Sequence, residues 1–231
     1  MRLKLLPRLY DYILYLIFIL VFPSSVLLSL YYPNVILNQG LSHRIFYFHV
    51  AVAWVSLYAP ILASVFGFLY LIKKNLKWDI LSFSANTIAV LFSICVLFSG
   101  PIWAKSAWGI PWDWTDARLQ SFFVLVITLV AYFITRGLIQ GLNTKATISS
   151  FLSVLCALTA LLTWGAIRWI ENPGNHPESV LGKGGMDWDM KLVFWHSIFS
   201  YHILFLIIFS LIYRQARLNS LLEYLKETSN E

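Results

Sequence analysis

The second apolar stretch of the chain, residues 46–72, reads FYFHVAVAWVSLYAPILASVFGFLYLI and contains no Lys, Arg, Asp or Glu. It is longer than the roughly 20 apolar residues that a helix needs to cross a bilayer. Lipid offers no hydrogen-bond partner to backbone amides, so a segment that crosses it must be helical. This stretch therefore predicts a membrane-spanning helix.

Comparable runs recur along the whole chain, in which 59% of the 231 residues are hydrophobic and only 12% are charged. Soluble domains carry about 25% charged residues. The runs that are long enough to span a membrane cover residues 12–31, 46–72, 80–103, 119–135, 147–168 and 191–213. We expect Gly100-Pro101 to end the third run. The sequence predicts an all-α integral membrane protein, a single domain over residues 1–231 that forms a six-transmembrane-helix bundle.

The charge pattern sets the expected orientation. The N-terminus is basic and leads into a run too long for a signal-peptide core, which predicts a retained first helix. With the N-terminus inside, eleven Lys and Arg fall on inner segments and six on outer ones. The positive-inside rule then places both termini in the cytoplasm and the loops 104–118 and 169–190 outside. The net charge of +6 is explained in this way, and no nucleic-acid partner is expected.

The external loop between the third and fourth spans is rich in tryptophan. Trp108, Trp112 and Trp114 precede Asp116 and Arg118 within one short segment. One interpretation is an interfacial loop whose indole rings lie at the level of the lipid headgroups. The other is a platform for a large, flat, apolar ligand with negative groups at one edge. Haem fits the second interpretation, because it is a planar macrocycle with two propionates and an iron that binds axial imidazole.

Cations that would pair with the propionates are Arg118, Lys105 and Arg44. All five histidines also map to the predicted outer loops or the outer halves of the spans. The chain has no C-x-x-C-H motif, which excludes covalent attachment of haem to this chain in the manner of a c-type cytochrome. We therefore expect the chemistry of this protein at its outer face.

Two segments carry a family resemblance. Residues 108–119, WGIPWDWTDARL, resemble the tryptophan-rich WWD signature of the haem-handling proteins of cytochrome c biogenesis. Residues 43–54, HRIFYFHVAVAW, are similar to the family segment that opens the second span. The six-span layout and the chain length resemble the CcmC-type members in particular.

The resemblance implies specific site residues. The implied haem contacts are Trp108, Trp112, Trp114, Asp116 and Arg118, and the implied axial ligand of the iron is His49. The family has a second histidine near the end of the fifth span, where residues 162–169 of this chain contain none. The available replacements are His176, which we favour as the second metal ligand because it lies nearest in sequence, and His196.

The resemblance also implies a function. The protein is expected to hold haem as a transient, non-covalent cargo at the outer, periplasmic face of the cytoplasmic (inner) membrane. It would deliver this haem to a chaperone of the CcmE type for maturation of c-type cytochromes, alongside a CcmA, CcmB and CcmD ABC complex. No catalytic constellation is found in the sequence, so a carrier is expected rather than an enzyme.

Two alternatives stay open. One is a stand-alone haem–apocytochrome ligase of the CcsA type. The other is a membrane transporter subunit for a hydrophobic substrate, in which the tryptophan loop merely anchors the protein to lipid.

Overall fold

The computed structural model describes residues 9–34, 39–170, 181 and 185–229, and all regular structure within them is helical. The elements are α1 (Leu9–Tyr31), the short 3-10 helix η1 (Leu41–Arg44), α2 (Ile45–Lys73), α3 (Leu76–Trp108), α4 (Ala117–Leu138), α5 (Leu142–Trp169) and α6 (Trp188–Ser229). The α-helices are the six segments long and apolar enough to cross a membrane, and each contains one predicted run. The prediction of an all-α, six-helix membrane protein is confirmed.

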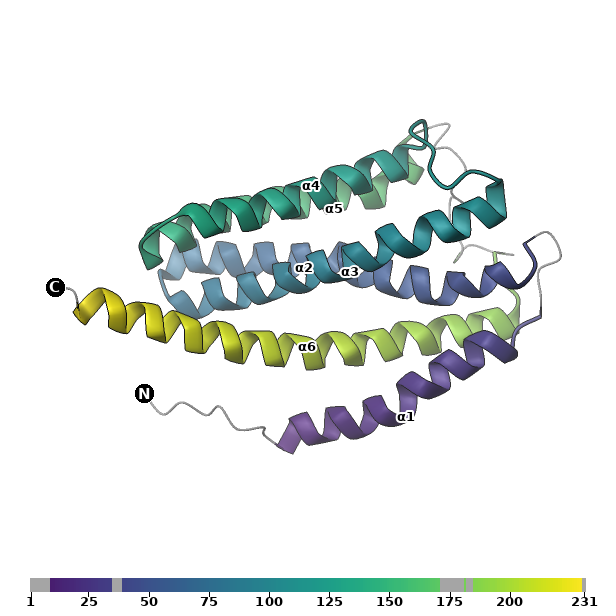
Figure 1. Ribbon diagram of the computed structural model, residues 1–231, viewed down its shortest axis with the longest axis horizontal. Coiled ribbons are helices and arrows are strands. Elements are labelled where there is room, and N and C mark those ends of the chain that lie inside the picture. Colours follow the sequence, from purple (N-terminus) through teal and green to yellow (C-terminus); the bar gives the residue numbers. More distant parts are fainter. Residues whose placement is uncertain (1–8, 35–38, 171–180, 182–184, 230–231) are drawn as a thin grey trace.

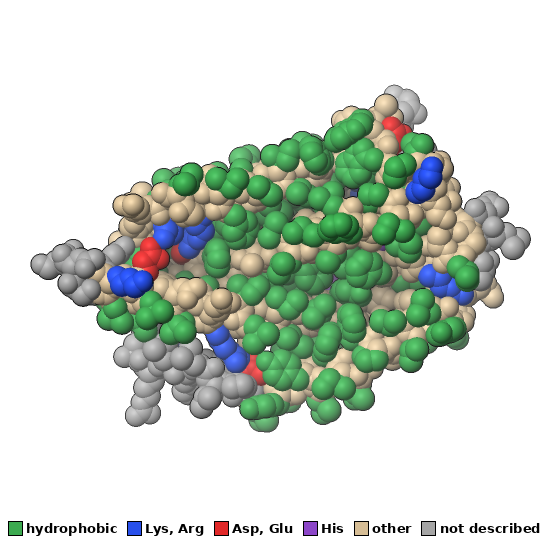
Figure 2. All heavy atoms as spheres, viewed as in Figure 1, with side chains coloured by type: hydrophobic (Ala, Val, Ile, Leu, Met, Phe, Trp, Pro, Cys, Tyr) green, Lys and Arg blue, Asp and Glu red, His purple; other side chains and the backbone are tan. Residues whose placement is uncertain are grey.

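The helices run up and down beside one another (Figure 1). α2 packs mainly on α3 and α5, α4 packs on α5, and α1 packs on α6. The end of α6 and the short connection between α2 and α3 lie at one end of the bundle, which we call the terminal end, and the segment 109–116 lies at the other, which we call the loop end. Figure 2 shows hydrophobic side chains over the middle of one face and charged side chains toward the two ends, as expected of a surface in contact with lipid.

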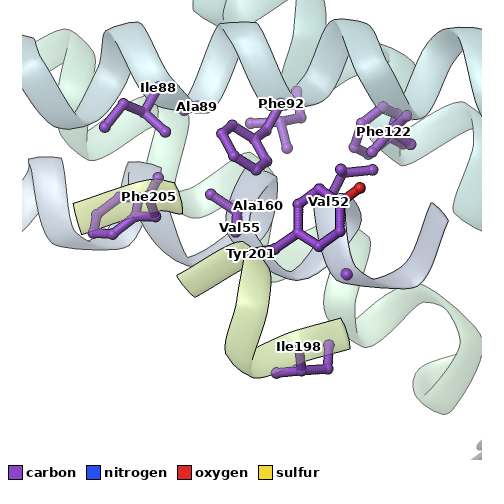
Figure 3. Close-up of a cluster of buried hydrophobic side chains, with 14 of the residues drawn as sticks. Val52, Val55, Ile88, Ala89, Phe92, Phe122, Ala160, Ile198, Tyr201 and Phe205 are labelled. Carbon is purple, nitrogen blue, oxygen red and sulfur yellow. The ribbon is translucent and has the colours of Figure 1, made fainter. Parts of the chain in front are cut away.

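The core draws on five of the helices. Val52 of α2, Phe92 of α3, Phe122 of α4, Ala160 of α5 and Tyr201 of α6 belong to one buried cluster (Figure 3). Lipid tails are as apolar as these side chains, so membrane helices associate through close packing and polar contacts rather than through the hydrophobic effect. The buried cluster therefore stabilises the bundle mainly through the close fit of side chains between helices.

Small polar side chains join α2, α3 and α5 inside the bundle. The Ser82 hydroxyl donates to the carbonyl of Ala63 at 2.8 Å, and the Asn86 amide donates to the Ser153 hydroxyl at 2.8 Å. Each residue in these two contacts is buried. Such interhelical hydrogen bonds contribute about 0.6 kcal/mol each in membrane proteins.

Ion pairs tie the helices together toward the terminal end. Arg136 of α4 donates two hydrogen bonds, of 2.8 and 2.7 Å, to the carboxylate of Asp79 on α3. The same end holds a pair between Lys145 of α5 and Glu223 of α6 at 2.5 Å. These contacts bring charges from helices that are distant in sequence into compensated pairs, which an apolar surrounding requires.

α2 and α5 are in close contact near the terminal end. A Cβ atom at Gly67 would lie 3.2 Å from the Cα of Ser150, which is backbone and has little room to move. Figure 1 shows α4 and α5 rising away from α2 toward the loop end. The two helices are therefore in contact toward one end of the bundle and farther apart toward the other.

The expectation that Gly100-Pro101 ends the third span is wrong, because α3 continues to Trp108. Proline removes one backbone hydrogen bond, but neighbouring helices make this tolerable in membrane proteins. Gly109, at φ 80°, ends the helix in the left-handed conformation that favours glycine. The non-helical tryptophan segment therefore covers 109–116 and is shorter than the predicted loop 104–118.

Replacing Gly67 with leucine should destabilise the bundle by about 1–3 kcal/mol, because the side chain would be forced against the α5 backbone. Thermal unfolding in detergent checks this. Gly137→Leu is the matched control, since nothing lies within 4 Å of a Cβ at that helical glycine. Equal unfolding temperatures for the two variants would contradict the close contact of α2 with α5.

Candidate functional site

A cavity of about 640 Å³ lies at the loop end, where α2, α3, α4 and α5 diverge. This volume falls in the range of roughly 300–1,000 Å³ that is typical of cofactor and small-molecule sites. Phe122 and Ala160 belong both to its wall and to the core, so the cavity continues the packed interior (Figure 3). Its lining is mainly apolar and includes a small set of imidazole, indole and guanidinium groups.

His49 lines this cavity from the second turn of α2. Its Nδ1 lies 2.9 Å from the Ser99 hydroxyl, which itself donates to the carbonyl of Cys95 at 2.7 Å. Because the hydroxyl hydrogen is used for that carbonyl, Ser99 accepts from the imidazole. This arrangement places the proton on Nδ1 and the lone pair on Nε2. A histidine that binds a metal through one ring nitrogen usually donates the N–H of its other ring nitrogen to a neighbouring acceptor. The His49 imidazole has this tautomer, with Ser99 as the acceptor.

A glycine makes room for that imidazole. A Cβ atom at Gly100 would lie 3.1 Å from Cε1 of His49, a contact that would force the ring to move. The ring of Trp103 lies on its other side, with centroids 5.7 Å apart. α3 therefore fixes the position of His49 through Ser99, Gly100 and Trp103, and the contact with Trp103 requires the helix to continue past Pro101.

The structure brings two of the three predicted tryptophans to the cavity. Trp108 and Trp112 line it, and Trp103 lines it as well. The Trp112 indole nitrogen is buried and has no hydrogen-bond partner among the residues that the structure describes. A buried donor in a cavity wall without a partner marks a place where a ligand acceptor can bind. Trp114 is not among the described residues of the lining; it is 59% exposed and packs edge-on against Phe123.

Asp116 begins α4 rather than facing the cavity. Its carboxylate Oδ1 accepts from the backbone amides of Arg118 at 3.0 Å and of Leu119 at 3.1 Å, which is an N-cap. The residue is fully buried and is not among the described lining residues. By fixing the first turn of α4, it positions Arg118, whose side chain does line the cavity.

The other expected cations bind backbone instead. Arg44 donates to the carbonyls of Ser29 at 3.0 Å and of Pro33 at 2.8 Å, and so covers the end of α1. Lys105 donates to the carbonyl of Gly109 at 2.9 Å. These two side chains stabilise backbone segments at the loop end, and neither is among the described residues that line the cavity.

The cavity has a second cation that the sequence analysis missed. Arg168, in the last turn of α5, lines the cavity together with Arg118. In the sequence, a single arginine at the end of an apolar run is most simply interpreted as a charge at the membrane surface. Its position between Trp164 and Trp169 was the only signal in the sequence.

The remaining histidines lie elsewhere. The Nε2 of His196 is 2.9 Å from the hydroxyl of Ser24 on α1, and His196 is not among the described residues of the cavity lining. His202 bonds to the carbonyl of Ile198 at 2.7 Å and stacks on Tyr58, which lines the cavity. His176 lies outside the described residues.

Comparison with known proteins adds a family match over nearly the whole chain. Residues 2–226 match the family model described as "CcmC: Heme exporter protein C". The chain is 29% identical over 156 residues to a cytochrome c biosynthesis ccmC-like mitochondrial protein of Marchantia polymorpha, a match that covers 68% of this chain and 65% of that protein. The match to heme exporter protein C of Bradyrhizobium diazoefficiens is 24% over 156 residues, covering 68% and 59%.

A shorter match of 95 residues to heme exporter protein C of Escherichia coli is 35% identical and covers 40% of this chain and 38% of that protein. In all three comparisons the chain spans less than two thirds of the length of its relative.

The cap at Asp116 gives a testable expectation. Asp116→Ala should cost about 1 kcal/mol of helix stability, because the first amides of α4 lose their acceptor, whereas Asp116→Asn keeps the cap. Amide hydrogen exchange at residues 117–120 in detergent micelles measures the effect. Exchange that rises equally in both variants would show that the charge of Asp116, and not its capping oxygen, is what matters.

Proposed function

This chain belongs to the CcmC, or heme exporter protein C, family, and from that membership we propose that it carries haem as a transient, non-covalent cargo in the cavity at the loop end. The observation that carries the proposal is the convergence of His49, Trp112 and Arg118 on one cavity. These groups come from three different helices or loops, and the fold brings them together.

The lining suits each part of a haem molecule. Indole faces supply flat apolar area to a macrocycle, and guanidinium groups pair with carboxylates. The lone pair on Nε2 of His49 is the donor that an iron porphyrin takes as an axial ligand. The buried Trp112 N–H adds a donor that has no partner within the described part of the chain. The residues present therefore fit the group that the family name implies.

The contact that His196 makes supports a choice between the two candidates for a second axial ligand. His196 bonds to Ser24 on α1 and is separated from the lining, so it would have to break that contact to reach the iron. We propose His176 as the second ligand, supplied by the segment between α5 and α6. His49 holds the iron from the α2 side in this account.

The protein's own role in this proposal is to bind and to release. Presenting haem requires no bond to be made or broken by the protein, so we propose a carrier rather than an enzyme. The cavity lies at the loop end, and the six apolar helices make the chain a multi-pass membrane protein. We propose that the loop end faces the periplasm, that both termini face the cytoplasm, and that haem passes to a chaperone of the CcmE type beside a CcmA, CcmB and CcmD complex.

His49→Ala should remove the axial iron ligand that α2 supplies and weaken haem binding by more than tenfold. Titration of purified wild-type and variant protein with haem in detergent, followed by the Soret band, measures this. Added imidazole should restore part of the wild-type spectrum in the variant, because it replaces the missing ring. A variant that titrates with the wild-type affinity and spectrum would sink the assignment of His49.

Ser99→Ala tests the hydrogen bond that orients the imidazole. Losing a partner of a metal-binding histidine weakens affinity by about 10–100-fold, so Ser99→Ala should fall between wild type and His49→Ala. Ser93→Ala is the matched control, since Ser93 is also a buried serine of α3 but does not line the cavity. The account expects the control to bind haem like the wild type.

A further inference from the structure

The connection between α2 and α3 lies at the terminal end of the bundle and carries a cluster of lysines (Figure 1). Only Lys74 and Asn75 separate the two helices. The backbone amide of Lys74 donates to the carbonyl of Tyr70 at 2.8 Å, and its Nζ lies 5.5 Å from the centroid of the Tyr70 ring. The Asn75 side chain accepts from the backbone amide of Lys77 at 2.9 Å. These contacts fix a tight turn around which Lys73, Lys74 and Lys77 are gathered.

Trp78, in the first turn of α3, holds two of these lysines. The Nζ atoms of Lys73 and Lys77 lie 5.1 and 5.7 Å from the centroid of its ring, which are cation–π contacts. The indole also stacks on Phe66 of α2, with ring centroids 6.1 Å apart. Tryptophan is enriched at the level of the lipid headgroups, because it combines an apolar ring system with a polar N–H. Trp78 therefore brings two ammonium groups to the depth at which a membrane carries its phosphates.

The positive charge of this turn is not neutralised by the described residues around it. Lys73, Lys74 and Lys77 are exposed, and none of them forms an ion pair within the described part of the chain. The carboxylates at this end whose side chains the structure describes are paired with other cations. These pairs are Asp79 with Arg136, Glu223 with Lys145 and Asp11 with Arg214. The turn thus presents three cations that can bind an external anion.

An apolar stripe of α2 leads directly to this turn. Val65, Phe68 and Ile72 follow one another at spacings of three and four residues, so they lie along one face of the helix. Each of these side chains is more than half exposed. Exposed apolar surface that adjoins polar groups is typical of a membrane contact. A lipid whose phosphate lies at the turn can therefore place its acyl chains along this stripe.

We infer that Lys73, Lys74 and Lys77, gathered beside Trp78, form a binding site for the headgroup of an anionic phospholipid in the leaflet at the terminal end. The lysines supply the charge, the indole lies beside the headgroup, and the α2 stripe receives the acyl chains. The electrostatic gain is about fivefold in affinity for each lysine near an anionic membrane surface. The site lies at the end of the bundle opposite the cavity, and it does not depend on the proposed function.

Binding of single lipids to the purified protein in non-ionic detergent, measured by native mass spectrometry, tests this site. The probes are phosphatidylglycerol and phosphatidylcholine with identical acyl chains, which share the phosphate and differ in net charge. The wild type should bind phosphatidylglycerol at least about tenfold more tightly, and this preference should weaken as the salt concentration is raised. Excess inorganic phosphate should not displace the lipid, because it lacks acyl chains. Displacement by inorganic phosphate would overturn the lipid as the ligand of the turn.

Lys73→Gln and Lys77→Gln should each weaken binding of phosphatidylglycerol by about fivefold and leave binding of phosphatidylcholine unchanged. Lys73→Arg combined with Lys77→Arg should keep the preference, because the charge and the cation–π contacts remain. The matched control is Lys191→Gln, which removes a charge from the first turn of α6 at the loop end. An equal loss in the control would show a general effect of protein charge and overturn the site.

Equal affinity of the wild type for the two lipids would also overturn the site. That result would point instead to a protein partner with an acidic surface.

Discussion

The close approach of α2 to α5 at Gly67 is the constraint on which the rest of the structure depends. With no side chain at that position, the α5 backbone at Ser150 lies near α2 at the terminal end, and the two helices then separate toward the loop end. Helices that packed evenly along their whole length would leave no cavity. The cavity lies at the end of the bundle where these two helices are farther apart.

The side chains that line the cavity depend on where α3 ends and where α4 begins. α3 places Ser99 and Gly100 against His49, which fixes the tautomer and the position of the ring, and its continuation past Pro101 adds Trp103 to these contacts. The cap by Asp116 starts α4 at the residue that places Arg118 on the cavity. Asp116 was expected from the sequence to contact the ligand, but in the structure it caps α4 and so positions Arg118.

The sequence was informative where a single physical rule dominates. Six apolar runs predict six helices, because the bilayer forces backbone hydrogen bonds to close within each segment. His49 and Trp112 could be proposed from a motif and its resemblance. The extension of α3 was missed because proline usually ends helices in soluble proteins. The contact of His196 with Ser24 could not be predicted from the sequence, because 172 residues separate the two side chains. The sequence also does not show which face of an apolar helix points toward lipid and which toward another helix.

A structure of the purified protein with haem bound tests the central claim most directly. The account predicts the macrocycle in the cavity between α2 and α5, with a direct bond from the iron to Nε2 of His49 and the propionates beside Arg118 and Arg168, which line the cavity. Haem bound between α1 and α6, with its iron on His196, would contradict the account, because that site lies outside the cavity lined by His49, Trp112 and Arg118.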